Sequence, residues 1–578
     1  MAGLRILSLG LGLLVVLACV PRSGADMIMT GGTILTMDKY LPPSEALAIV
    51  DGRILAVGRE AEILPLANRR TKRIDLQGAV VVPGLMDSHL HLVGFGQFLD
   101  QLQLVGTSSA EEIAGLVASR AAELPPGTWI QGRGWDQNDW KHQAFPTRQV
   151  LDRAAPDHPV VLYRVDGHAI WTNSRALTLA GLTASTPNPQ GGVILKDKSG
   201  DPTGVFIDNA VALVRDIMPQ PTPDDIRTWV LTAIQHLNQL GLTGIHDPGV
   251  DGATLEVIRE LVDEGNFNLR YYGMLSGSDE ALLEQHLSKG PVINYGGRLT
   301  IRTVKFYLDG ALGSRGAALL SPYSDDPNNR GLILTSPDLL EDLVSRTFQA
   351  GFQPAIHAIG DRANRLALDI YERITPQFKG QDLRPRIEHA QVIAARDIRR
   401  FAQLGVIAAM QPSHATSDMT WAEDRLGARR VRNAYTWRRL LDAGATIAGG
   451  SDSPVESANP LLQLYAARTR QDTTGWPEEG WYPDQRMGGL EALRTLTIGS
   501  AYAAFEDSTR GKIFPGYDAD LTVLSKNPVI GDPKELLSID VLMTVLAGQV
   551  VWSNQSGWQA LAHRNDAQKD ADAASFPE

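Results

Sequence analysis

The first residues that could do chemistry are two histidines separated by a single position. His89 and His91 follow an apolar segment over residues 80–87. If that segment is a β-strand, residues two apart point to the same side, so the two imidazoles project together. Two imidazole nitrogens at this spacing are suitable ligands for one metal ion. A His-x-His pair alone is a weak indication, because such pairs also occur at surfaces and in cores.

Three further candidate ligands stand at the ends of later segments. His357, His389 and Asp452 each terminate an apolar or glycine-rich run. A hydrogen-bonded core histidine is the ordinary interpretation of each histidine taken singly. Their recurrence at the ends of successive predicted strands favours a shared site, because the active sites of (β/α)8 barrels lie at the carboxyl ends of the strands.

Lys305 is a lysine inside the apolar run 303–307, where a bare ammonium group would be costly to bury. One interpretation pairs it with Asp309 or exposes it on the outer side of its strand. In the other, carbon dioxide converts the lysine to a carbamate, whose two oxygens can bridge two metal ions.

The elements that must position these residues alternate between two kinds. Apolar segments typical of buried strands are separated by amphipathic helical segments, which is the pattern of parallel βα units. We therefore predict an α/β fold, a (β/α)8 TIM barrel over residues 83–504. Its expected strands cover residues 80–87, 244–247, 269–275, 301–308, 352–357, 386–389, 406–411 and 446–452, and its clearest helices cover 336–350, 363–375, 395–404 and 433–443.

Both ends of the chain differ from the middle. Short strands with turn residues such as Asp51-Gly52 predict one composite β-sandwich domain from residues 26–82 and 505–557. The stretch of about 124–216 is rich in Gly, Pro, Trp and Asn, and we expect it to be an insertion over the barrel mouth. Residues 558–578 form a polar segment that we expect to be a loose tail.

The composition excludes some classes of partner. The chain has 578 residues, 43% hydrophobic and 21% charged, which is ordinary for a folded protein. Its formal net charge of −12, with no dominant basic stripe, argues against a nucleic-acid partner or an anionic-membrane surface. A small-molecule substrate is the partner that we expect, and assembly into a homo-oligomer is left open.

The N-terminus has the order of a secretory signal. Arg5 precedes an apolar run over 6–20, and the small residues 23–25 follow it. We expect a signal peptide over residues 1–25, export to the periplasm or the medium, and no membrane span after processing; a retained anchor is the alternative. Cys19, the only cysteine, follows a segment similar to a bacterial lipoprotein box, so a lipid anchor at Cys19 is a second alternative.

Five motifs in order resemble the amidohydrolase superfamily. They are the segment 83–91, Lys305 with Asp309-Gly310, the segment 357–361, the segment 386–391 and the segment 450–455. More narrowly, they resemble the branch that includes the N-substituted formamide deformylases and the YtcJ-like hydrolases (amidohydrolase family 3). The resemblance covers nearly the whole chain after the signal. It implies a barrel with a composite β-sandwich and a centre of two divalent ions, for which zinc is the metal that we expect.

By this resemblance, His89, His91 and Asp452 bind one metal ion, His357 and His389 bind the other, and carboxylated Lys305 bridges them. The implied reaction is hydrolysis of a non-peptide carbon–nitrogen bond by a metal-activated hydroxide. Asp452 then takes the proton of the water and passes it to the leaving nitrogen. The alternatives are a mononuclear deaminase-type enzyme and a non-catalytic barrel used for binding or regulation.

Six residues are candidates for contact with the substrate. They lie in the insertion or follow barrel strands: Trp135, His168, Trp171, Arg315, Gln411 and His414. For the two tryptophans, packing of the insertion is an equally good interpretation.

Overall fold

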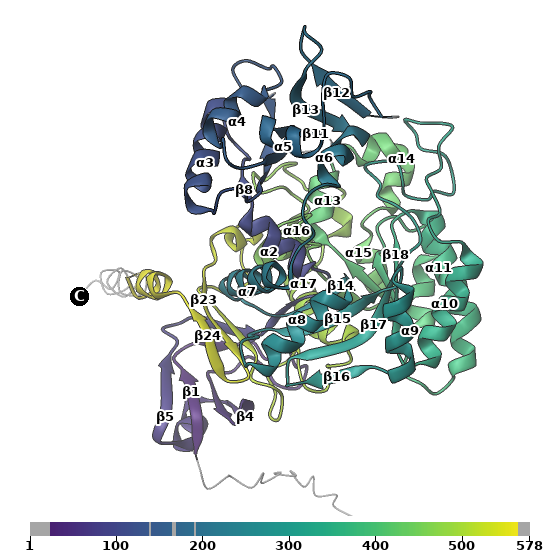
Figure 1. Cartoon of the computed structure of the whole chain (residues 1–578). Helices are drawn as coiled ribbons and strands as arrows, with labels where there is room; N and C mark the ends of the chain where they lie inside the picture. The colour runs from purple at the N-terminus through teal and green to yellow at the C-terminus, as the bar shows by residue number, and fades with distance from the viewer. Residues whose placement is uncertain (1–23, 138–139, 165–168, 190–191, 564–578) are drawn as a thin grey trace, which may run out of the picture.

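A computed structural model of the chain describes residues 24–137, 140–164, 169–189 and 192–563 (Figure 1). Nearly all of the predicted signal segment, including Cys19, lies outside these residues, as does His168. The first strand, β1 (Ala25–Thr30), begins within the last position of that segment. In the described ranges, no helix is both long enough and apolar enough to cross a membrane.

Eight parallel strands form the barrel predicted from the sequence. Neighbouring strands are hydrogen-bonded in a single path from the last strand to the first. The path closes between its two ends through a hydrogen bond from Ser88 N to Gly449 O of 2.9 Å and a parallel bridge of Leu90 with Ser453. The strands are β7 (Leu85–Asp87), β14 (Leu242–Val250), β15 (Arg270–Ser276), β17 (Leu299–Tyr307), β18 (Gln353–Ala358), β19 (Arg386–His389), β20 (Ile407–Met410) and β21 (Ile447–Gly449).

The first predicted barrel strand, residues 80–87, is in fact two strands in two different sheets. β6 (Val80–Pro83) belongs to the terminal β domain, and only β7 belongs to the barrel. The chain turns from one sheet to the other at Gly84, where a Cβ atom would lie 2.2 Å from Thr243 Oγ1. The apolar run was continuous because both strands are buried, so hydrophobicity alone did not reveal the break.

The outer helices follow from amphipathic patterns. In α10 (Pro337–Gln349), Ser336 accepts a hydrogen bond from Leu339 N, and Pro337 occupies the first turn. Leu340, Val344 and Phe348 share the face that packs on the barrel. The other helices of this ring are α7 (Pro223–Gln239), α8 (Gly252–Asp263), α9 (Glu280–Lys289), α11 (Asp361–Ile374), α12 (Ile398–Leu404), α15 (Trp437–Asp442) and α16 (Pro460–Thr469).

The composite β domain contains strands from both ends of the chain, as predicted. One sheet has the order β4-β3-β1-β5 and the other the order β2-β6-β22-β23-β24. Asp51 and Gly52 both have positive φ, 49° and 73°, as a two-residue hairpin turn requires. The strands are β2 (Thr33–Ile34), β3 (Ala46–Val50), β4 (Arg53–Gly58), β5 (Ala67–Asp75), β22 (Leu521–Leu524), β23 (Val541–Leu546) and β24 (Gln549–Ser553). The segment predicted to be a loose tail is helical in its described part. Residues 555–563 form a helix, and Leu561 packs into the core of this domain.

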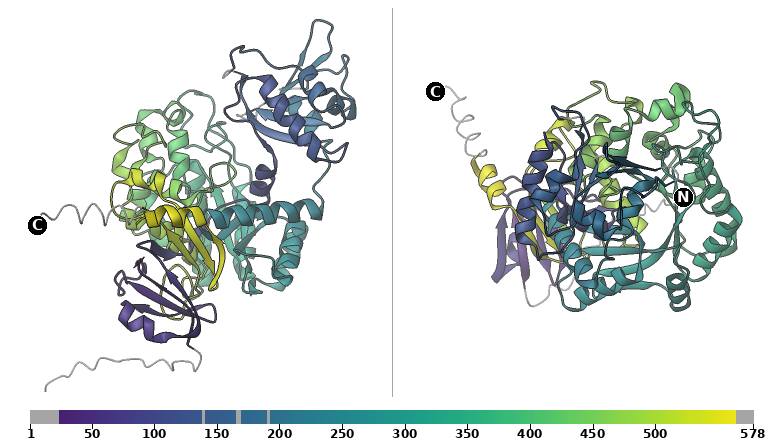
Figure 2. Two further views of the ribbon diagram at one scale, coloured as in Figure 1. Left: turned by 90° about the vertical axis from the view of Figure 1, so that its left-hand side faces the viewer. Right: turned by 45° about the horizontal axis from the view of Figure 1, so that its top comes forward.

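The insertion forms a lobe of its own above the barrel (Figures 1 and 2). Its six-stranded sheet begins at β8 (Leu102–Gln103), and α3 (Ala110–Glu123) packs on it, so the lobe starts before the predicted residue 124. The chain returns from the lobe into α7, which leads into β14, so the lobe is joined to the barrel at the carboxyl ends of the strands. The remaining strands are β9 (Ile130–Trp135), β10 (Val160–Arg164), β11 (Ala169–Thr172), β12 (Gly192–Lys196) and β13 (Pro202–Asp208).

Candidate metal centre

Three predicted ligands from three different strand ends converge at the barrel mouth. His89, His389 and Asp452 each offer a ligand atom, and these atoms lie within 4.8 Å of one another. His389 ends β19 with φ of 72°, and Asp452 follows β21 with φ of 61°. Side chains other than glycine rarely adopt this left-handed region, and such strain is concentrated at functional sites. The backbone is therefore held in costly conformations where it aims two of the ligands.

His91 lies beside Asp452 of this group, and His357 lies beside His389. His91 Nε2 is 3.2 Å from Asp452 Oδ1, and His89 Nε2 is 3.5 Å from the same oxygen. The ring of His357 lies 4.6 Å from that of His389, measured between centroids. His357 Nε2 is buried and has no hydrogen-bond partner among the described residues. A buried nitrogen left without a partner is costly unless something else binds it.

Lys305 lies in the same cluster and is 1% exposed. Within the described ranges its ammonium makes no ion pair, and its Nζ lies 4.9 Å from the centre of the Tyr307 ring. The alternative pairing with Asp309 is not formed: the Asp309 carboxylate instead accepts the backbone N–H groups of Ala318, Ile359 and Gly360 at 2.8–2.9 Å. Burial lowers the pKa of Lys305 to about 8.

Burial keeps three histidines of the centre neutral: His89, His357 and His389. Burial lowers the pKa of His89 to about 4 and that of His357 to about 3, and it lowers the pKa of His389 well below its usual value. Burial alone would raise the pKa of Asp452, but the surrounding His91, His89 and His389 lower it well below its usual value. Metal ligands must be neutral imidazoles and ionised carboxylates, so the protonation states fit a divalent metal ion.

Two hydrogen bonds direct the histidine nitrogens toward the centre. His89 Nδ1 lies 2.5 Å from Glu388 Oε2, and His389 Nδ1 lies 2.9 Å from Gln411 Oε1. Carboxylate and amide oxygens accept, so each Nδ1 donates and each Nε2 keeps its lone pair for the centre. Gln411, which the sequence predicts to contact the substrate, therefore binds His389 through the ring nitrogen that faces away from the centre.

Glu388 and Arg386 are functional residues for which the sequence reasoning had assigned no role. Arg386 Nε donates to Glu388 Oε1 at 2.8 Å, and its other nitrogens contact Ser88 O and His246 Nδ1, each at 2.9 Å. Burial would raise the pKa of Glu388, but Arg386 and His89 lower it far below its usual value. The available signal was the pair of opposite charges two residues apart within one apolar strand.

The other described candidates for substrate contact are divided among three places. His414 lies at the centre, with its ring stacked 6.1 Å from that of His389 and its Nε2 3.7 Å from Asp452 Oδ2. Trp135 and Trp171 are 0% exposed and pack in the core of the inserted lobe, and Arg315 bonds to Asp325 at 2.8 Å. The substrate roles of these residues stay predictions. Tyr307, which the sequence reasoning did not single out, is 38% exposed beside Lys305 and His357.

The match to a known family covers most of the chain. Residues 72–552 match the model of the amidohydrolase family. The chain belongs to this family. The amidohydrolase is 34% identical over 533 residues to the putative amidohydrolase YtcJ of Bacillus subtilis, covering 91% of this chain and 99% of that protein.

Two further relatives and one solved structure extend the comparison. The amidohydrolase is 35% identical to LONG AFTER FAR-RED 3 of Arabidopsis thaliana, covering 91% of this chain and 92% of that protein. It is 29% identical to the N-substituted formamide deformylase of Arthrobacter pascens, covering 90% and 97%. The crystal structure of an uncharacterized metal-dependent hydrolase from Pyrococcus furiosus superposes with a TM-score of 0.74 at 30% identity, covering 87% of this chain and all of that one. Family and fold together support a hydrolase whose donor cluster suits a divalent metal.

Proposed function

We propose that this amidohydrolase cleaves a non-peptide carbon–nitrogen bond of a small molecule, in an amide or an N-formyl or N-acyl amine. The observation that carries the proposal is the buried donor cluster at the barrel mouth, in which His357 Nε2 has no hydrogen-bond partner among the described residues. The similarity to an N-substituted formamide deformylase over most of both chains supports the choice of bond.

The donors would hold two divalent ions, with zinc as the metal that we expect. His89, His91 and Asp452 would bind one ion, His357 and His389 the other, and carboxylated Lys305 would bridge them. The ammonium of Lys305 would release a proton to solvent, and the resulting amine would add to carbon dioxide and lose a second proton, which turns a cation into an anionic ligand with two oxygens. Such a centre supplies Lewis acidity and a water of lowered pKa.

Asp452 is the group that would move the proton. Its carboxylate lies within 3.2–3.7 Å of the ring nitrogens of His91, His89 and His414, so it is held at the edge of the cluster. It would accept the proton of the attacking water and deliver it to the departing nitrogen. This delivery is needed because an unprotonated amine is a poor leaving group.

One observation favours a second candidate, a mononuclear amidohydrolase of the deaminase type. His89, His389 and Asp452 already form a three-ligand group by themselves. Three protein ligands with one open position are typical of a catalytic zinc site. In that enzyme Lys305 would stay unmodified.

A metal and substrate screen tests the proposal. The metal-loaded protein should hold two ions per chain by elemental analysis and should hydrolyse members of N-formyl, N-acyl and cyclic amide panels. Asp452→Asn is the matched variant, because it keeps the volume of the side chain but not its basicity. One ion in a fully active preparation would favour the mononuclear enzyme. Absence of any carbon–nitrogen hydrolysis by protein that holds both metals would contradict the proposed reaction.

We also propose that the protein is exported. The predicted signal segment ends at Ala25, which is the first residue of β1, so cleavage after Ala25 would leave residues 26–30 of the strand in place. Mass spectrometry of protein recovered from the native host should find the signal segment missing. A lipid on Cys19 would identify an anchored form, and an intact chain in the cytosol would contradict export.

A further inference from the structure

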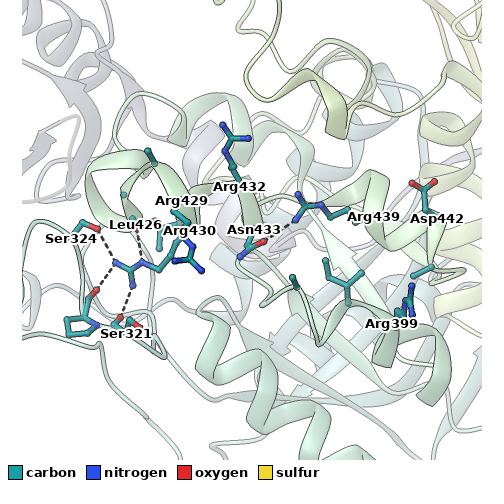
Figure 3. Close-up of a pocket in the computed structure, with 16 residues that line it drawn as sticks. Ser321, Ser324, Arg399, Leu426, Arg429, Arg430, Arg432, Asn433, Arg439 and Asp442 are labelled. Carbon is teal, nitrogen blue, oxygen red and sulfur yellow. Dashed lines mark hydrogen bonds between the residues drawn. The ribbon is translucent and has the colours of Figure 1, made fainter.

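An arginine-rich cleft lies among the outer helices of the barrel, and none of its lining residues belongs to the donor cluster (Figure 3). It has a volume of about 1220 Å³ and lies between the 321–324 loop, α12, α14 (Ala422–Arg430), the short helix η5 (Val431–Asn433) and α15. Five arginines line it: Arg399, Arg429, Arg430, Arg432 and Arg439. We call this feature the arginine cleft.

Within the described residues, none of these five arginines has an acidic partner. The helices α12, α14 and α15 each also carry one arginine outside the cleft lining, and those three are paired: Arg400 with Asp369 at 2.8 Å, Arg425 with Asp325, and Arg438 with Glu491 at 2.7 Å. The protein as a whole carries a net charge of −12, so the local excess of positive charge is not a property of the composition.

The acidic residue among the lining residues does not neutralise the positive charge of the cleft. Asp442 is bonded to Arg438 at 3.0 Å, and Arg438 is not one of the lining residues. Five positive charges that face one concave surface repel one another and raise the local concentration of anions.

The cleft wall is fixed by one of its own arginines. Arg430 donates to Leu426 O, Ser321 O and Pro322 O at 2.6–2.9 Å, which ties α14 to the 321–324 loop. α14 bends at Gly427, where φ is 73° and a Cβ atom would lie 2.7 Å from Ser324 Oγ. The close approach of helix and loop therefore depends on a glycine. Of the other four arginines, Arg439 donates to Asn433 Oδ1 at 3.0 Å and Arg432 lies over the ring of Tyr482, whereas Arg399 and Arg429 make no hydrogen bond or ion pair with described residues.

We propose that the arginine cleft binds a linear ligand with several phosphate groups. The guanidinium fork matches phosphate oxygens and binds them through charge-assisted hydrogen bonds. Figure 3 shows the arginines spread along the cleft, from Arg430 near Ser321 and Ser324 to Arg399 near Asp442. This spacing suits an extended anion better than a single compact one. Phosphates carry more charge per group than carboxylates, so an oligophosphate can compensate most of the cleft by itself.

Calorimetric titration with inorganic tripolyphosphate tests the proposal on the metal-loaded full chain. The variant Arg399→Gln/Arg429→Gln removes two exposed cleft arginines that make no hydrogen bond or ion pair with described residues, so the fold should be unaffected. We expect its affinity for tripolyphosphate to fall by about tenfold or more, since two charge-assisted contacts are lost. The affinity of the unaltered protein should also weaken as salt is added.

The matched control is Arg69→Gln/Arg70→Gln, which removes the same charge from two exposed arginines of β5. It should bind tripolyphosphate as the unaltered protein does. Equal weakening in both variants would show a net-charge effect and would overturn the proposal, as would no binding by the unaltered protein. Tripolyphosphate that chelates the metal ions of the metal centre would also release or absorb heat. That heat signal would persist in the Arg399→Gln/Arg429→Gln variant, and a loss of metal measured after the titration would identify it. Tighter binding of citrate, or binding to anionic vesicles alone, would also overturn the proposal.

Discussion

The predicted site residues of the barrel mouth converge on a shared point, whereas those of the inserted lobe pack into a hydrophobic core. At the mouth, His89, His389 and Asp452 come from distant parts of the sequence and converge within 4.8 Å. In the lobe, Trp135 of β9 and Trp171 of β11 lie on either side of β10 in one sheet and pack against each other, with ring centroids 6.3 Å apart. The first group leaves lone pairs directed at a shared point, whereas the second fills its own core.

The difference is one of geometry at the ends of the elements. Parallel strands of a closed barrel bring their carboxyl ends to one rim, so polar residues there face one another wherever they lie in the sequence. A strand of a separate open sheet has no such constraint, and even Trp135 at the end of β9 packs within its own layer. Position at a barrel strand end is therefore a stronger indicator of function than residue type.

Removal of Lys305 should give the largest effect at the mouth. If carboxylated Lys305 bridges two ions, Lys305→Ala should lose at least one ion and several kcal/mol of transition-state stabilisation, which is on the order of 10³-fold in rate or more. Lys305→Arg should fare no better, because a guanidinium group forms no carbamate and stays charged. Elemental analysis and steady-state rates measure both quantities.

A chemical rescue makes the test specific to the bridge. Short carboxylic acids at millimolar concentration should partly restore the Lys305→Ala enzyme by occupying the space of the carbamate. Full metal content and near-normal rates in Lys305→Ala without any rescue would show that the centre does not need this residue.

Truncation of Trp171 should instead act on the stability of the lobe. The side chain is 0% exposed and contacts Trp135 and Trp140, so Trp171→Ala should cost about 3–5 kcal/mol of folding free energy locally. Limited proteolysis and tryptophan fluorescence should report early opening of the lobe, while metal content stays unchanged. Trp171→Phe is the conservative control, since its ring fills most of the same space. A raised KM with unaltered stability would place Trp171 in the substrate site.

Glu388→Gln should have an intermediate effect on metal affinity. The variant keeps the shape of the side chain but removes the charge that accepts from His89 Nδ1 and pairs with Arg386. Loss of such an outer partner costs about 10–100-fold in metal affinity. Competition with a chelator measures the affinity, and Glu341→Gln, which breaks the surface pair with Arg373, serves as the control. Unchanged affinity in Glu388→Gln would mean that His89 is held by packing alone.

The sequence was sufficient for the barrel and for the convergence of His89, His389 and Asp452 at its mouth, because both depend on local patterns. Buried parallel strands are continuous apolar runs, and a His, Lys or Asp at the end of such a run is conspicuous. It was insufficient at Gly84, where two buried strands of different sheets follow each other without a polar residue between them. The sequence also did not show that α3 belongs to the inserted lobe, because an amphipathic helix has the same pattern whether it covers a barrel or a separate sheet.

The residues behind the ligands could not be assigned for a different reason. Glu388 and Arg386 form a buried ion pair that contacts His89, 299 positions away from Glu388 in the sequence. Only the fold brings them together. Trp135 and Trp171 show the converse, since a buried aromatic residue and a substrate-binding aromatic residue have the same sequence signature.

Arg315 should give the smallest effect and is the sharpest test of the rule that strand ends matter most. It follows β17 by eight positions and bonds to Asp325 through Nε at 3.1 Å and through a terminal nitrogen at 2.8 Å, and Asp325 also contacts Arg425. A partly exposed ion pair contributes about 0–1 kcal/mol, so Arg315→Gln should change kcat, KM and stability by only a few-fold at most. Asp325→Asn, which removes the partner, should behave like Arg315→Gln if the pair only fixes the loop. A tenfold rise in KM for anionic substrates in Arg315→Gln alone would instead place this guanidinium in the substrate site, and the strand-end rule would then have to include the loops that follow.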